Sequence, residues 1–260
     1  MTNRMSATIA VAVLAIAGFV TPVRADWNPG DSYKMHYPQL PDPLGWDVAV
    51  ATVTPPPPAA VADDWLCTET GPVSDIHIWF SMRGDAPPIP SLMAFTIWSD
   101  VPDPDGTGPA YSTPGTLLWN RIFAPFEFTI RPYGTGQEGW YDPNNGIVVP
   151  NDHFTYWQLN LNIDPLGAFV QQEGEIYWLG VNFEPTWGNV GWKTSQDHFN
   201  DDAVYWDFAG GGGWQELLDP VTHESLDMAF VITTIPEPST VMLVGFGVVG
   251  LLAINRRKKS

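Results

Sequence analysis

Short runs of alternating apolar and polar residues fill the middle of the chain. Ile76, Ile78 and Phe80 are predicted to face one way, and Asp75, His77 and Ser81 the other. The same period of two recurs in four further runs, at residues 93–97, 157–163, 177–183 and 228–232. Such runs, bounded by Gly, Pro, Asn and Asp, predict β-strands. Strands with one apolar face favour an all-β fold, specifically an antiparallel β-sandwich of the jelly-roll kind.

The N-terminus has the pattern of a secretory signal. Arg4 precedes an apolar stretch from Ala7 to Val20, and Val23-Arg24-Ala25 ends in a small residue. This order of a basic start, an apolar stretch and a small residue predicts a signal peptide over residues 1–25, which lies outside the folded domain. We therefore expect the protein to be exported through the inner membrane.

The C-terminus carries a second targeting pattern, in residues 236–260. Pro236, Glu237 and Pro238 precede an uncharged apolar run, 240–254, and the run is followed by a basic stop. The basic stop comprises Arg256, Arg257, Lys258 and Lys259. A helix over 240–254 would be about 22 Å long, shorter than the roughly 30 Å of a bilayer core. The segment predicts a marginal transmembrane helix with its basic end in the cytoplasm.

This tail closely resembles the PEP-CTERM sorting signal of Gram-negative bacteria. The resemblance implies that an exosortase-type enzyme processes the chain after the export machinery has brought it to the membrane. It also implies a final location at the cell surface or in the extracellular matrix, with only transient contact with the inner membrane. An uncut tail that stays as a single-span anchor is the alternative, and the sequence leaves both open.

Between the two targeting segments the chain reads as one domain with a leading arm. Residues 26–60 contain the polyproline stretch Thr54–Pro58 and predict an extended N-terminal arm with a Pro-rich linker. Residues 61–235 hold the strand patterns and predict the β-sandwich domain. No internal repeat divides the body further.

The charge of the body is strongly acidic. The whole chain has a net charge of −18, and 28 of its 29 acidic residues lie between Asp26 and Ile235. Only five basic residues lie in that region: Lys34, Arg83, Arg121, Arg131 and Lys193. Because nucleic acids bind through Lys and Arg, this composition argues against a nucleic-acid partner. Plain solubility or a saline habitat is the favoured explanation of the charge, and divalent cations and neutral glycans remain compatible partners.

The 13 tryptophans are the main candidates for ligand contact. Those within strand patterns, such as Trp79 and Trp178, are expected to pack in the core. Four others lie near glycine-rich loops and predict a glycan-stacking set: Trp140, Trp187, Trp192 and Trp214. Stacking on a sugar ring and structural packing are the two interpretations of this set.

An aspartate-rich turn is the best metal candidate. Asp100, Asp103 and Asp105 alternate before Gly106, and calcium prefers such oxygen ligands. A second acidic cluster, Asp197–Asp202, would bind the same ion or another one. The alternative is a solvated acidic turn without a metal. The single cysteine and five scattered histidines do not have the spacing of a zinc site.

The sequence predicts that the protein is not an enzyme. It lacks the nucleophile elbow, the zinc-protease helix motif and the P-loop. His153 or His198 beside a carboxylate is a general-base candidate, and a carboxylate pair suited to glycoside hydrolysis remains open. Cys67 stands alone, so no intramolecular disulfide can form, and it is expected to be a small buried hydrophobe.

The body also resembles an uncharacterised domain of planctomycete exported proteins, across about residues 45–233. The motifs that carry this resemblance are Ala62–Cys67, Gly71–Trp79, Ile97–Asp100, Pro114–Gly115 with Leu118–Trp119, Gly191–Ser195, Asp197–Val204 and Asp227–Ile232. The resemblance implies an exported β-rich domain and brings no catalytic residue.

Together these patterns predict an exported, non-enzymatic cell-surface or matrix protein that binds exopolysaccharide, with calcium as a structural ligand. The alternative is a carbohydrate-active enzyme, a glycoside hydrolase or lyase, on the same β-sandwich.

Overall fold

The structure, a computed structural model, describes residues 26–50, 60–103, 110–184, 186, 188–208 and 210–233. Within these residues the fold is all-β, with one short 3-10 helix, η1 (Arg83–Asp85). The strands are β1 (Trp46–Ala49), β2 (Val61–Leu66), β3 (Gly71–Val73), β4 (Asp75–Met82), β5 (Met93–Val101), β6 (Thr113–Phe123), β7 (Phe128–Asp142), β8 (Ile147–Asn162), β9 (Phe169–Gln171), β10 (Ile176–Phe183), β11 (Val190–Ser195), β12 (Val204–Trp206), β13 (Trp214–Glu216), β14 (Asp227–Met228) and β15 (Phe230–Thr233).

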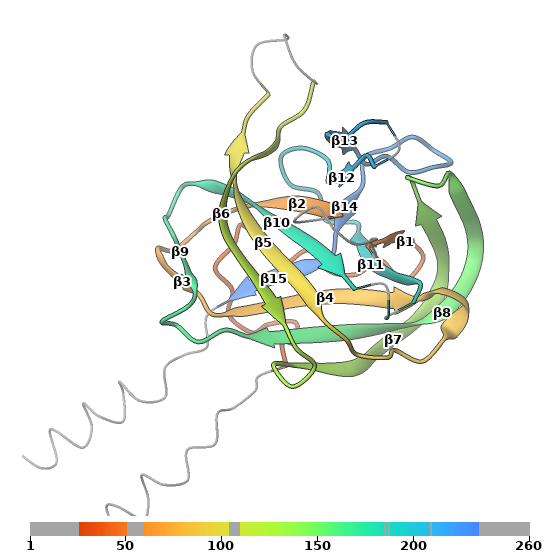
Figure 1. The fold of residues 1–260 in the computed structure, drawn as a ribbon, viewed down its shortest axis with the longest axis horizontal. Coiled ribbons are helices and arrows are strands. Elements are labelled where there is room, and N and C mark those ends of the chain that lie inside the picture. Colours follow the sequence, from red (N-terminus) through yellow and green to blue (C-terminus); the bar gives the residue numbers. More distant parts are fainter. Residues whose placement is uncertain are drawn as a thin grey trace, which may run out of the picture.

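Two large sheets pack against each other (Figure 1). One has the strand order β13-β12-β2-β10-β5-β6, and the other has the order β14-β11-β1-β7-β8-β4-β15. Aromatic side chains meet across the interface: Trp65 of β2 contacts Phe230 of β15, and Phe80 of β4 contacts Phe183 of β10. These residues are fully buried, so the hydrophobic core lies between the two sheets.

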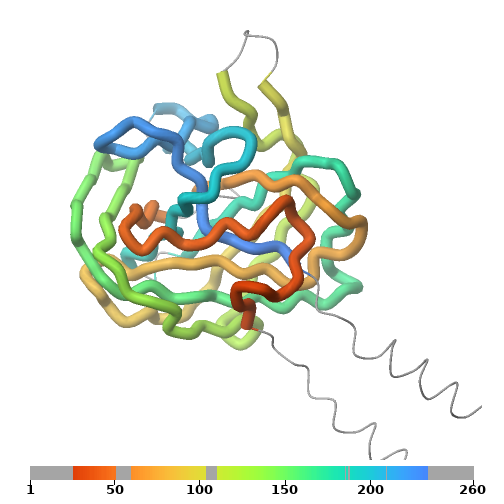
Figure 2. Tube along the Cα trace, turned by 180° about the vertical axis from the view of Figure 1, so that it is seen from behind, coloured from red at the N-terminus to blue at the C-terminus, as the bar shows by residue number. Residues whose placement is uncertain are grey.

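Part of the second sheet closes on itself. Strand β11 pairs with β1 on one side and with β4 on the other, so the order β11-β1-β7-β8-β4 returns to β11. The result is a small five-stranded barrel in which β1 and β7 are parallel and the other pairs are antiparallel. The long β7–β8 hairpin bends around this barrel, as the tube in Figure 2 shows. Register shifts at three places in the hairpin account for the bend, because β-bulges curve a strand.

The predicted all-β class is confirmed, and the closed barrel is what the sequence did not indicate. Period-two patterning identifies a strand and its buried face, but it carries no information on whether the last strand pairs with the first. The mixed barrel with its parallel β1–β7 pair therefore replaces a purely antiparallel sandwich. The N-terminal arm predicted over 26–60 also needs correction, since its residues Trp46–Ala49 form β1 in the centre of the sheet.

The strand patterns themselves are confirmed. The five alternating runs correspond to β4, β5, the second half of β8, β10 and the β14–β15 pair. Cys67 follows β2 as a buried free thiol, as expected. The predicted signal peptide, the polyproline stretch and the predicted transmembrane helix of the tail lie outside the described residues, so these predictions stay untested. Among the described residues, none forms a helix that is long and apolar enough to cross a membrane.

Gly139 of β7 permits a close approach that a side chain would block. A Cβ atom at this position would lie 2.3 Å from the indole of Trp46. We expect Gly139→Ala to lower the free energy of unfolding by about 1–3 kcal/mol, the range for overpacking. Gly167→Ala is the matched control, since its Cβ would meet nothing closer than 3.7 Å. Denaturant unfolding measures both, and equal stability of the two variants would contradict this packing.

Candidate functional site

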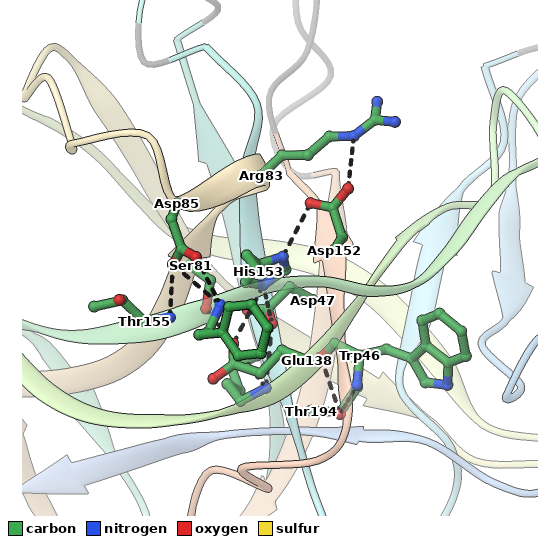
Figure 3. A network of polar contacts seen from close by, with 12 residues as sticks. Trp46, Asp47, Ser81, Arg83, Asp85, Glu138, Asp152, His153, Thr155 and Thr194 are labelled. Carbon is green, nitrogen blue, oxygen red and sulfur yellow. Dashed lines mark hydrogen bonds and ion pairs between the residues drawn. The ribbon is translucent and has the colours of Figure 1, made fainter.

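Each of the five barrel strands contributes one polar side chain to a single cluster, and Figure 3 labels those from β1, β4, β7 and β8. The contributors are Asp47 from β1, Ser81 from β4, Glu138 from β7, His153 from β8 and Lys193 from β11. All five are 0% exposed. Because they contact one another from every strand of the ring, they fill the barrel interior. We call these five residues the barrel cluster.

Local backbone geometry places two of these side chains. Asp47 and Lys193 are direct cross-strand partners in the antiparallel β1–β11 pair, so their side chains are neighbours on one face. Glu138 lies between two register shifts in the β7–β8 ladder. A bulge changes the direction of a side chain relative to regular alternation, and here it brings the carboxylate inward.

Short polar contacts join the cluster. His153 Nε2 lies 3.0 Å from Asp47 Oδ2 and 3.2 Å from Glu138 Oε2. Lys193 Nζ lies 3.2 Å from each of the same two oxygens. Ser81 Oγ donates to Glu138 Oε2 at 2.7 Å. Two carboxylates thus share two nitrogen groups and one hydroxyl, without contact with solvent.

The protonation of the cluster follows from its burial and its ion pairs. Burial alone lowers the pKa of His153, but hydrogen bonds to Asp47 and Glu138 outweigh it and raise the pKa to about 10. Burial raises the pKa of Asp47, yet the charge of Lys193 and the His153 hydrogen bond bring it below its usual value. The pKa of Glu138 is raised, chiefly by burial. His153 is therefore a cation at neutral pH and Asp47 a carboxylate.

A second layer of contacts holds the histidine in place. His153 Nδ1 lies 3.2 Å from Asp152 Oδ2, and the other oxygen of Asp152 lies 3.5 Å from Arg83 Nε. The Arg83 guanidinium in turn lies 5.7 Å from the centre of the Trp140 ring. Both ring nitrogens of His153 thus donate to carboxylates, which agrees with a charged imidazolium.

Two oxygens in the cluster have no hydrogen-bond partner, Asp47 Oδ1 and Glu138 Oε1. Asp47, Glu138 and His153 also offer ligand atoms within 4.8 Å of one another, the arrangement of a metal site. The ammonium of Lys193, however, already neutralises the two oxygens that such an ion would use. The donor set therefore fits a self-neutralised group of four charges better than a metal centre.

A second group of buried acids lies where β2 meets β14. Asp63, Asp64 and Asp227 are 0%, 0% and 1% exposed. Asp63 accepts from the Met228 backbone and from Gln39, and Asp64 accepts from Asn200. Burial raises the pKa of Asp64 to about 9, and burial also raises the pKa of Asp63 and Asp227. Unlike the barrel cluster, these acids face no Lys or Arg ion pair among the described residues.

The predicted metal turn is only partly in the described structure. Asp100 accepts from the Trp178 indole at 2.8 Å, and burial raises its pKa together with the charge of Asp201. Asp103 is exposed, and Asp105 lies outside the described residues. Asp100 thus lies close enough to Asp201 of the 197–202 cluster for their charges to interact.

The four tryptophans predicted for stacking differ in exposure. Trp140 is 2% exposed and Trp192 is 0% exposed, so neither indole is available at the surface. Trp187 lies outside the described side chains. Trp214 is half-buried and makes edge contacts with Trp98 and Trp206, with ring centres 6.1 Å and 5.3 Å apart. Loop position alone did not separate buried from accessible indoles.

The barrel cluster was largely missed from the sequence. The sequence offers His153 as a general-base candidate. Asp47, Glu138 and Lys193, however, are separated by 91 and 55 positions along the chain and share no motif. The one signal available was Lys193 itself, since it is one of five cations in the body and lies in a strand with few other charges.

The fold and the site define an acidic all-β domain with an ion cluster inside a small closed barrel. Residues 35–233 match the family described as Domain of unknown function (DUF7901), and the chain belongs to this family. Residues 234–258 match the PEP-CTERM protein-sorting motif, which implies export, exosortase processing and sorting to the cell surface. No curated protein and no solved structure matches the chain.

Proposed function

We propose that this protein is a non-enzymatic component of the cell surface or extracellular matrix that binds exopolysaccharide. The observation that carries the proposal is a half-buried aromatic group on the six-stranded sheet, formed by Trp98, Trp206 and Trp214. Flat indoles supply apolar area for a sugar ring, and neighbouring polar groups supply hydrogen bonds to its hydroxyls. The sorting motif supports the same location, where polysaccharide is abundant.

Polar side chains surround this aromatic group. Glu216 follows Trp214 within β13, and Tyr111 donates its hydroxyl to the Trp214 carbonyl at 3.5 Å. Asp100 lies in β5, two residues after Trp98. The acidity of the surroundings favours a neutral glycan over a uronic-acid polymer, because like charges repel. Structural calcium near Asp100, Asp201 and Asp64 belongs to the same proposal, since a cation would relieve the mutual repulsion of these acids.

A binding measurement tests the proposal. We expect the purified full chain to be retained on neutral glycans of an array, and Trp214→Ala to lower the affinity about tenfold through lost stacking. Trp119→Ala is the matched control, because this half-buried indole packs beside Phe123 on β6, away from Trp214. The array is run with calcium and with chelator. Absence of retention in both conditions, or equal loss in both variants, would remove the proposal.

One observation favours the enzyme alternative. Burial and a hydrogen bond with Asp202 raise the pKa of Glu216 to about 7, which suits a general acid. Glycoside hydrolysis needs two carboxyl groups at least about 5 Å apart, whereas these two are joined by a hydrogen bond. The carboxyl groups of the barrel cluster and of the Asp63, Asp64 and Asp227 group are buried, so a polymer cannot reach them. Release of reducing ends from a neutral polysaccharide, abolished by Glu216→Gln, would replace binding with catalysis.

A further inference from the structure

Lys193 and Asp47 form a reactive pair within the barrel cluster. The amine and the carboxyl group are directly opposite each other on β1 and β11, with Nζ 3.2 Å from Oδ2. Both side chains are 0% exposed. An amine and a carboxyl group held at this distance without solvent have the geometry of reactants for amide formation rather than of a surface ion pair.

The neighbours supply the groups that such a reaction needs. Glu138 Oε2 lies 3.2 Å from the same Nζ, so this carboxyl group can take and return a proton. His153 Nε2 lies 3.0 Å from Asp47 Oδ2, so the imidazolium can pass a proton to that carboxyl group. Ser81 holds Glu138 from the other side at 2.7 Å. Nucleophile, electrophile, proton carrier and proton donor thus come from four different strands.

We propose that Lys193 and Asp47 become joined by an intramolecular amide bond, formed by the folded protein itself with Glu138 as the proton carrier. Glu138 removes a proton from the Lys193 ammonium, and His153 passes its Nε2 proton to Asp47 Oδ2, so the free amine attacks Cγ of a neutral carboxyl group. The C–N bond forms, one nitrogen proton returns to His153, and the oxygen that His153 protonated leaves together with the proton held by Glu138. In net terms the lysine nitrogen gives up two protons, one carboxyl oxygen leaves as water, and the third proton stays on the amide. Glu138 and His153 end as they began, so no oxidant, activated ester or cofactor is needed.

The buried environment favours the product. Reactants fixed by the fold react at effective concentrations of about 10⁵–10⁸ M, far above those of separate molecules in water. The reaction replaces a buried ammonium and a buried carboxylate by one neutral amide. It also converts Asp47 Oδ1, which has no hydrogen-bond partner, from a carboxylate oxygen into a neutral carbonyl or into water. An unpaired neutral oxygen costs less in an apolar interior than an unpaired charged one.

The bond would give this exported chain a covalent cross-link that it otherwise lacks. Cys67 is the only cysteine, so no disulfide can connect distant parts of the body. The amide would fasten β1 to β11 and close the chain between residues 47 and 193. This inference rests on the barrel cluster alone and is independent of glycan binding.

Mass spectrometry tests the bond directly. The full chain is expressed, purified and denatured, and the intact mass of each species is measured. This mass is compared with the mass calculated from the sequence between the N- and C-terminal residues of that species. We expect a deficit of one water molecule. After trypsin, cleavage behind Lys193 should disappear, and the peptide Met35–Arg83, which contains Asp47, should remain attached to the segment around Lys193. A folded wild-type chain with its full, unmodified mass would overturn the proposal.

Three variants separate this chemistry from a structural role, with near-ultraviolet circular dichroism reporting the fold. Lys193→Met should keep its full mass because it has no amine to react. Glu138→Gln should also keep its full mass, because it retains Lys193 and Asp47 but lacks the proton carrier. Asp47→Asn should lose ammonia instead of water and give a product with the same mass as the wild-type product. A water deficit that persists in Lys193→Met, or a folded Asp47→Asn chain that stays uncoupled, would also overturn the bond.

Discussion

Replacing Lys193 by methionine is expected to lower the free energy of unfolding by about 3–5 kcal/mol. Methionine has a similar length but no charge, so the carboxylates at 3.2 Å lose one of their two cations in a site without solvent. Removing one partner of a buried ion pair leaves an uncompensated charge, and that charge accounts for losses of this size. Where the proposed amide is present, its absence in the variant adds to the loss. Denaturant unfolding measures the change.

Lys34→Met is the matched control for this variant. Lys34 pairs with Glu69 at 2.9 Å, but the Glu69 side chain is 66% exposed. Pairs that are open to solvent contribute about 0–1 kcal/mol, so the control should stay close to the wild type. Adding Asp47→Asn to Lys193→Met should recover part of the loss, because it removes the charge that was left unpaired. Equal effects of Lys34→Met and Lys193→Met would refute the sealed ion cluster.

The sequence predicts most strands well because the alternation of apolar and polar residues is contained within each strand. The alternation at Ile76, Ile78 and Phe80 marks the core face of β4 without knowledge of any other strand. Trp46–Ala49 has no such alternation over its four residues, and its place in the sheet comes from pairing with β7 and β11. A strand that is defined by distant partners leaves little local signal, so β1 was assigned to an arm.

The candidate site was harder to predict for a related reason. Glu138 reaches the barrel interior through a bulge, and a bulge breaks the alternation from which facing is inferred. Trp140 and Trp192 each follow a glycine, which suggests a loop position. Both nevertheless lie in strands and are buried. Acidic residues are so frequent in this body that the buried ones cannot be told from the solvated ones by composition. Which acids are buried depends on how distant strands come together, both in the closed barrel and at the β2–β14 contact.

The two buried acidic groups have opposite electrostatics, and this difference has consequences for stability. In the barrel cluster, Asp47 is stabilised as a carboxylate by Lys193 and His153. At the β2–β14 contact, Asp63, Asp64 and Asp227 lie among other acids, and their pKa values are raised. The first group is held together by ion pairs with Lys193 and His153. In the second group the only ion-pair partner among the described residues is His198, 3.4 Å from Asp227, and burial favours the protonated form of the acids.

The second group therefore predicts that the protein becomes less stable as the pH rises. The pKa of Asp64 is about 9 in the folded state, against 3.8 as its ordinary value. Between these values the folded state keeps a proton that the unfolded state releases, so the free energy of unfolding falls as the pH increases. The stabilisation is complete below pH 3.8 for this residue and is lost once the pH has risen through about 9.

Asp64→Asn should remove much of this dependence. The hydrogen bond from Asn200 to Asp64 is 2.7 Å long in the wild type, and an asparagine at position 64 keeps an oxygen that can accept it. The asparagine side chain has no carboxyl proton to lose. We expect the variant to match the wild type below about pH 3.8 and to have a flatter profile above it. At pH 8–9 the variant should be more stable than the wild type by several kcal/mol, on the basis of about 1.4 kcal/mol per pKa unit. Asp103→Asn, at an exposed position, should leave the wild-type profile unchanged. Stability that rises with pH in the wild type, in calcium-free buffer, would mean that Asp64 is ionised in the fold and paired with a cation.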